Sequence, residues 1–130
     1  IRKEVFMNPN FKFCKSVGYE MLYNLYPHLS CIIGNSSSGI IEAPFFKIPT
    51  INIGDRQKGR FMHKSILQTT YSSASIIKAI KFSNSKKFRN SISGMKYEFG
   101  SVNSVDKIIE VIKKMKIDQK LLRKKLVTNN

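Results

Sequence analysis

The stretch "IIGNSSSGIIEAPFFKIPTINIGDRQKGR" (residues 32–60) decides the fold of this chain. Two short apolar runs, "CIIG" (31–34) and "PTINIG" (49–54), are typical of strands that are buried on both faces of a parallel sheet. Between them, "IIEAPFFK" (40–47) predicts a short helix that Pro44 confines or kinks. The segment therefore predicts a strand, a helix and a second strand in succession.

Strands and helices continue to alternate on both sides of this segment. Apolar residues that recur three and four positions apart predict helices, and short apolar runs predict strands. By these rules we expect strands at 10–16 and 65–70, helices at 17–29, 73–82 and 104–117 with Ser104 as an N-cap, and a polar, loose stretch from 83 to 101. The pattern indicates an α/β fold, a parallel sheet with flanking helices, in which ligands bind beyond the carboxyl ends of the strands.

The composition fits one domain or a piece of one. The chain has 130 residues, of which 42% are hydrophobic, and this is enough to form a core. It starts at Ile1 in a charged, element-like stretch, which suggests a fragment of a longer protein. Cys14 and Cys31 lie in apolar runs, so we interpret them as buried thiols of a reducing compartment, without a disulfide or a metal. No apolar run approaches the roughly 20 residues of a membrane span, so we expect a cytoplasmic protein with no membrane partner.

The net charge of +15 raises the question of nucleic acid as a partner. The distribution of the lysines weakens this interpretation, because many of them flank predicted helices and the densest cluster is "KKMKIDQKLLRKKL" (113–126). No aromatic RNA-binding motif or zinc-knuckle spacing supports it. Specific nucleic-acid binding is therefore the less favoured hypothesis.

The serine-rich loop between the first two strands of this segment has the chemistry of a phosphate site. Gly34 and Gly39 match the spacing GxxxxG, but Ile40 and Ile41 replace the Lys-Ser/Thr pair of a Walker motif, which disfavours an NTPase. What remains is a helix N-terminus with free amides and three hydroxyls, which suits a phosphate or a diphosphate. The alternative is that residues 36–38 only cap the helix.

Two charged residues strengthen the interpretation as a nucleotide site. Glu42 is explained by the dipole of a first helical turn, yet it is also placed to accept hydrogen bonds from sugar hydroxyls beside a bound anion. Arg56 lies just past a strand end, where a guanidinium can bind phosphate through two hydrogen bonds, and Lys58 and Arg60 could assist it. Asp55 is expected to hold its own loop. Diphosphate on the loop amides with ribose on Glu42 would make this a nucleotide site.

The same residues resemble a known family. "GNSSSGIIEAPFFKIPTINIGDRQKGR" (34–60) closely resembles the C-terminal domain of hydrolysing UDP-N-acetylglucosamine 2-epimerases of bacterial sialic-acid pathways. The resemblance runs from Phe11 through the last long helix and includes "KSVGYEML" (15–22) and "YEFGSVNSVDKII" (97–109). Non-hydrolysing epimerases have other residues at both loops, so the hydrolysing branch is the better match.

The resemblance implies a GT-B architecture, in which two Rossmann-like domains hold a UDP-sugar in the cleft between them. Residues 1–130 would then be a partial C-terminal, nucleotide-binding domain, without the N-terminal domain that carries the catalytic carboxylates. The implied reaction eliminates UDP to give a 2-acetamidoglucal, to which water adds to yield N-acetylmannosamine. No metal or other cofactor is implied, and the full enzyme is expected to be a homo-oligomer.

The resemblance also assigns UDP binding to individual residues. Ser36 and Ser37, with the loop amides, would hold the diphosphate, and Gly39 belongs to the same set. Glu42 would bind the ribose hydroxyls, Arg56 would neutralise phosphate charge as UDP leaves, and Val17 would line the uracil pocket. Two alternatives stay open: a GT-B glycosyltransferase, against which "GDRQKGR" argues, and a basic α/β module that binds nucleic acid.

Overall fold

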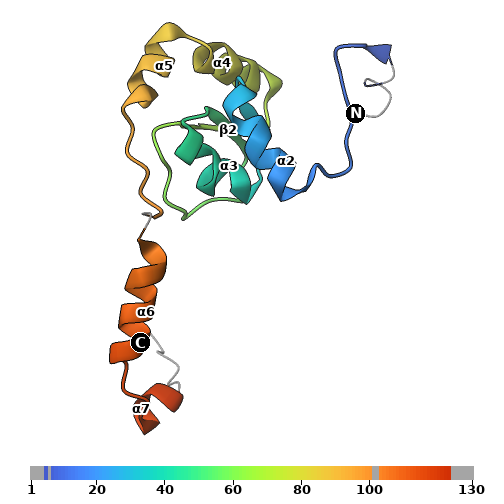
Figure 1. The fold of residues 1–130 in the computed structure, drawn as a ribbon. Helices are drawn as coiled ribbons and strands as arrows, with labels where there is room; N and C mark the ends of the chain where they lie inside the picture. The colour runs from blue at the N-terminus through green and yellow to red at the C-terminus, as the bar shows by residue number, and fades with distance from the viewer. Residues whose placement is uncertain (1–4, 6, 101–102, 124–130) are drawn as a thin grey trace. The chain divides into compact units, whose positions relative to one another are not determined.

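A computed structural model describes residues 5, 7–100 and 103–123 (Figure 1). The chain divides into two compact units, one up to Glu98 and the other from Phe99 onward, and each is described by itself. No helix of the described residues is both long and apolar enough to cross a membrane.

The first unit is built on a three-stranded parallel sheet with the order β1-β2-β3. The strands are β1 (Ile32–Gly34), β2 (Thr50–Ile53) and β3 (Ile66–Thr69). Ile51 of the central strand pairs with Ile33 on one side and Leu67 on the other. The prediction of an α/β fold with a parallel sheet is therefore confirmed, and all three strands fall inside the predicted ranges.

Helices flank this sheet (Figure 1). α3 contacts β1 and β2, whereas α4 contacts β2 and β3. The predicted helix at 17–29 ends in a 3₁₀ turn that contains Pro27, and the one around Pro44 is split into an α-helix and a 3₁₀ turn, as expected of proline. The elements are α2 (Gly18–Leu25), η1 (Tyr26–His28), α3 (Ser37–Ile41), η2 (Ala43–Phe46), α4 (Ser73–Ser83) and α5 (Lys86–Ser93).

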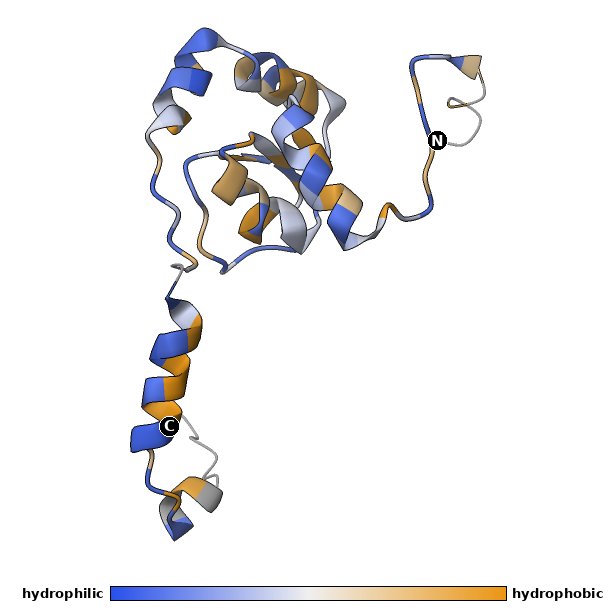
Figure 2. Cartoon of the chain, in the orientation of Figure 1, coloured by the Kyte–Doolittle hydropathy of each residue, from blue (hydrophilic) through white to orange (hydrophobic). Residues whose placement is uncertain are grey.

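The second unit contains α6 (Ser104–Lys114) and α7 (Gln119–Leu122). Figure 2 shows that α6 is apolar along one face and polar along the other, which confirms the predicted amphipathic helix. The predicted N-cap is off by one residue, because Asn103 occupies the cap position and Ser104 is the first residue of the helix.

Several predictions about the first unit are wrong. Residues 10–16 form no strand, because their apolar side chains alone cannot supply the neighbouring strand that a ladder needs, and they lie exposed. Cys14 is accordingly exposed rather than buried, and Cys31 is only half-buried. β1 is not buried on both faces, since it forms one edge of the described sheet and Ile33 is 47% exposed.

The stretch expected to be loose contains α5. Its start is fixed by the Ser85 hydroxyl, which accepts a hydrogen bond from the Phe88 N–H at 3.2 Å. Phe88 and Ile92, four positions apart, are both buried. A serine cap followed by apolar residues four positions apart is a helix signal. It is obscured because the same eight residues contain two lysines, an arginine and an asparagine.

The hydrophobic core lies where η1 and η2 meet. Tyr26, Ala43 and Ile48 form its buried centre. The ring of Tyr26 stacks on that of Phe46, with ring centroids 4.9 Å apart. Partly buried apolar residues surround this centre, namely Leu22, Leu29, Ile32 and Phe46. The core therefore fixes the end of α2 against the segment that follows α3.

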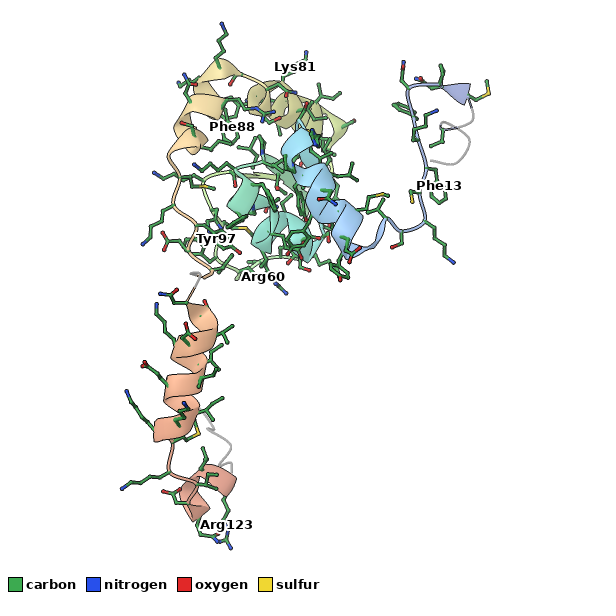
Figure 3. All side chains as sticks on the ribbon, viewed as in Figure 1. Phe13, Arg60, Lys81, Phe88, Tyr97 and Arg123 are labelled. Carbon is green, nitrogen blue, oxygen red and sulfur yellow. The ribbon has the colours of Figure 1, made fainter. Side chains whose placement is uncertain are left out.

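A second buried feature of the same unit is an aromatic stack around His63, which is 4% exposed. Its ring stacks on Tyr97, with centroids 5.4 Å apart, and Phe61 approaches it edge-on. His63 Nε2 accepts a hydrogen bond from the Glu98 N–H at 3.1 Å. Figure 3 shows the Tyr97 side chain, which also donates to the Ile41 carbonyl oxygen at 2.9 Å.

Gly39→Ala should destabilise the first unit, because a Cβ at Gly39 would lie 2.8 Å from Thr50 Cγ2 on β2. Moving α3 off the sheet costs about 1–3 kcal/mol. That cost exceeds the gain of about 1 kcal/mol from replacing glycine in a helix. Gly94→Ala is the matched control, since a Cβ there meets nothing within 4 Å. Urea unfolding measures both, and equal midpoints for Gly39→Ala and the wild type would contradict the close packing.

The stability of this unit should fall as the pH drops through the range in which His63 titrates. Burial lowers the pKa of His63, an effect that the charge of Glu98 partly offsets. The unfolded chain then binds a proton more readily than the folded one, so stability is full above the unfolded pKa of about 6.5 and declines below it. Urea midpoints at pH 8 and pH 5 should differ less in His63→Gln than in the wild type. His28→Gln, which removes an exposed imidazole, is the control.

Candidate functional site

Three loops meet at one edge of the sheet, because the carboxyl ends of parallel strands point the same way. β1 leads into the serine loop, β2 into "GDRQKGR" and β3 into Thr70–Ser72. Gln57 Nε2 donates to the Asn35 carbonyl oxygen at 2.7 Å, and Arg56 Nη1 lies 3.4 Å from the same oxygen. These contacts bring the serine loop and "GDRQKGR" together at one edge of the sheet.

Gln57 is a residue that the sequence analysis missed. Its side chain is buried, at 3% exposure, although it sits in a loop of charged and glycine residues. An amide that is buried in such a loop needs a hydrogen-bond partner, and Asn35 supplies it across 22 positions of sequence. The one neutral polar residue among the charges of "DRQKGR" was the available signal.

The serines cap α3, as the alternative interpretation expected. Ser36 is the N-cap, and its Oγ accepts a hydrogen bond from the Ser38 N–H at 3.4 Å. Ser37 is the first residue of the helix, and both Ser36 and Ser37 are exposed. Capping and ligand binding are compatible, because the capping bond uses a lone pair of Ser36 and leaves the Ser37 hydroxyl at the surface.

Gly39 is buried inside α3, where its Cα faces Thr50 of β2. The absence of a side chain at this position lets the helix approach the sheet closely. Packing therefore explains the glycine without a ligand.

Glu42 lies at the opposite end of α3 from the position expected. It is the C-cap of α3, which runs from Ser37 to Ile41, and it also directly precedes η2, where its side chain makes no capping hydrogen bond. Its Oε2 accepts a hydrogen bond from the Tyr26 hydroxyl at 3.0 Å. This half-buried carboxylate is thus tied to the core, and Tyr26 is a second residue that the sequence analysis missed.

A groove of about 740 Å³ lies between α2 and Glu42. Its wall is mostly apolar and aromatic, with two carboxylates on it. The lining residues are Tyr19, Glu20, Leu22, Tyr23, Asn24 and Glu42. Val17, half-buried, directly precedes α2 and lies two residues before Tyr19. The groove can hold a planar, partly apolar group beside a hydrogen-bond acceptor.

The "GDRQKGR" loop is positively charged. Arg56, Lys58 and Arg60 are all exposed, and Arg60 extends from the surface in Figure 3. Against these three cations stands one carboxylate, Asp55, which accepts a hydrogen bond from the Tyr71 hydroxyl at 3.4 Å. That bond ties Asp55 to the neighbouring loop rather than to its own. Within the described residues, no three His, Cys, Asp or Glu side chains come together as a metal site.

Comparison with known proteins identifies the family. Residues 1–113 match the family described as UDP-N-acetylglucosamine 2-epimerase. The chain is 34% identical over 109 residues to the polysialic acid biosynthesis protein P7 of Escherichia coli. This match covers 78% of this chain and 28% of that protein. It is 42% identical over 66 residues to a UDP-N-acetylglucosamine 2-epimerase of Neisseria meningitidis. This match covers 51% of this chain and 18% of that protein.

A third relative is the hydrolysing GDP/UDP-N,N'-diacetylbacillosamine 2-epimerase of Campylobacter jejuni, 48% identical over 58 residues. That match covers 45% of this chain and 15% of the relative. The chain thus spans less than a third of the length of each of these relatives. Because the family match extends over most of the chain, the protein belongs to the UDP-N-acetylglucosamine 2-epimerase family.

Proposed function

We propose that this chain is the nucleotide-binding part of a hydrolysing UDP-N-acetylglucosamine 2-epimerase. The observation that carries the proposal is that Arg56 and Gln57 contact the serine loop at one edge of the sheet. The chain in which they do so belongs to the epimerase family. Residues 1–130 are then part of the C-terminal domain of a GT-B fold. The N-terminal domain supplies the catalytic carboxylates, and the full enzyme is a homo-oligomer.

The site binds UDP through three kinds of contact. The hydroxyls of Ser36 and Ser37 and the amides near Gly39 donate to the diphosphate, and the Arg56 guanidinium adds charge-assisted hydrogen bonds to it. Glu42 accepts hydrogen bonds from the ribose hydroxyls. Val17 lines the pocket for the uracil ring, at the start of the helix whose residues form the groove.

In the reaction, the bond between C1 of the sugar and the UDP oxygen breaks, and the proton on C2 is removed. This elimination gives a 2-acetamidoglucal and free UDP. Water then adds, with a proton to C2 from the face that yields N-acetylmannosamine and a hydroxyl to C1. Negative charge develops on the leaving diphosphate, so Arg56 stabilises the transition state, and donors of this kind are worth about 10²–10³ in rate. The sugar is N-acetylglucosamine or a related N-acetyl sugar.

The site should bind UDP, and Glu42→Ala and Arg56→Ala should each weaken binding. A hydrogen bond to a charged group is worth about 1.5–3 kcal/mol, which corresponds to roughly a 10- to 150-fold loss of affinity. Amide chemical shifts of the chain, followed during a UDP titration, report both the affinity and the site. Lys81→Ala, which removes an exposed charge from α4 (Figure 3), is the control for net charge.

A parallel titration with a short RNA separates this proposal from a basic nucleic-acid module. The proposal expects saturable UDP shifts centred on 36–42 and 56. RNA binding that falls steeply with salt and ignores Glu42→Ala and Arg56→Ala, in a chain that does not respond to UDP, would overturn it.

Gln57→Glu should weaken UDP binding without a direct contact to the ligand. The substitution replaces the amide donor to the Asn35 carbonyl with a carboxylate that the carbonyl oxygen repels. The serine loop then loses its link to "GDRQKGR", and we expect an affinity loss of about tenfold or more. The amide signals of 35–37 should shift before ligand is added. Wild-type UDP affinity in a folded Gln57→Glu chain would contradict this role.

A further inference from the structure

The Tyr26 ring is held rigidly at the start of η1. The residue is fully buried, and it stacks on Phe46 with an interplanar angle of 26°. Tyr23 meets the same ring edge-on, with centroids 5.7 Å apart. A ring fixed on two sides presents its hydroxyl in one direction. That direction leads to Glu42, whose Oε2 accepts a hydrogen bond from the hydroxyl at 3.0 Å.

The Tyr26 hydroxyl acts only as a donor toward this carboxylate. Burial raises the pKa of Tyr26 to about 12, with further contributions from its hydrogen bond to Glu42 and from the charge there. The phenol therefore keeps its proton throughout the physiological range. Oε2 of Glu42 is held by this bond, and among the described residues no donor reaches Oε1.

We propose that Tyr26 is a positioning residue that orients Glu42 so that its second carboxylate oxygen selects nucleotides with ribose hydroxyls. This inference rests on the proposed function, because it takes Glu42 as the ribose acceptor. Tyr26 itself touches no ligand. Its ring belongs to the core, and only its hydroxyl acts on the site.

Tyr26→Phe isolates that hydroxyl, because the phenylalanine ring keeps the stacking on Phe46. The 130-residue chain and the variant are titrated with UDP, with 2′,3′-dideoxy-UDP and with inorganic pyrophosphate. The wild type should prefer UDP to the dideoxy compound. In Tyr26→Phe this preference should shrink at least about fivefold, since about 1 kcal/mol of hydrogen bonding corresponds to that factor. Pyrophosphate affinity should stay unchanged.

Thr69→Val is the matched control for a structural role. Thr69 is buried, and its hydroxyl donates to the Asn52 carbonyl oxygen at 3.3 Å, outside the Glu42 network. Thr69→Val should lower the urea midpoint about as much as Tyr26→Phe does. It should retain the full preference for UDP over the dideoxy compound. If Tyr26→Phe also keeps the wild-type preference, the positioning role is overturned.

A measurement without ligand separates failure of this inference from failure of the proposed function. The carboxylate ¹³C signal of Glu42 at pH 7 should move in Tyr26→Phe and stay in place in Thr69→Val. A wild-type chain that shows no preference for UDP overturns the assignment of ribose to Glu42, whatever the ¹³C signal does. An unmoved ¹³C signal in Tyr26→Phe shows that Tyr26 does not hold the carboxylate, even where UDP binds.

Discussion

The close approach of α3 to β2 at Gly39 determines the geometry of the whole site. Because Thr50 occupies the space that a Cβ would take, the helix lies against the sheet in one position only. Its start at Ser37 is then fixed beside the carboxyl end of β1, and Glu42 is fixed at its other end. Five residues of helix span about 7.5 Å. The packing at Gly39 therefore also sets the distance between the serine loop and Glu42.

Two side chains hold the ends of this short helix in place. Gln57 secures the serine loop from the side of β2, and Tyr26 secures Glu42 from the core. A five-residue helix has little stability of its own, since isolated helices shorter than about 12 residues are marginal in water. The surrounding fold must therefore supply the order that a binding site needs. Buried polar contacts do this better than apolar packing alone, because each requires a defined direction.

The sequence predicted the elements that have local signals and missed the contacts that have none. Short apolar runs located β1, β2 and β3, and proline located the break after α3. The run at 10–16 failed because an apolar pattern does not show whether a neighbouring strand exists. Tyr26 and Gln57 reach their partners across 16 and 22 residues, so no local pattern could pair them. Glu42 was recognised, but its place on the helix was wrong because the start of α3 was set too late.

Under the proposed function, the described site binds the nucleotide and stabilises the leaving diphosphate, and it does not transfer the proton. Three cations stand in the "GDRQKGR" loop, which suits a diphosphate that gains charge as it leaves. Two carboxylates near the serine loop and "GDRQKGR" accept hydrogen bonds from tyrosines: Glu42 through Oε2 from Tyr26, and Asp55 through Oδ1 from Tyr71. Removal of the C2 proton needs a base within hydrogen-bond reach of the sugar. Under the proposed function, that base comes from the N-terminal domain. One domain then binds UDP, and the other removes the proton from the sugar.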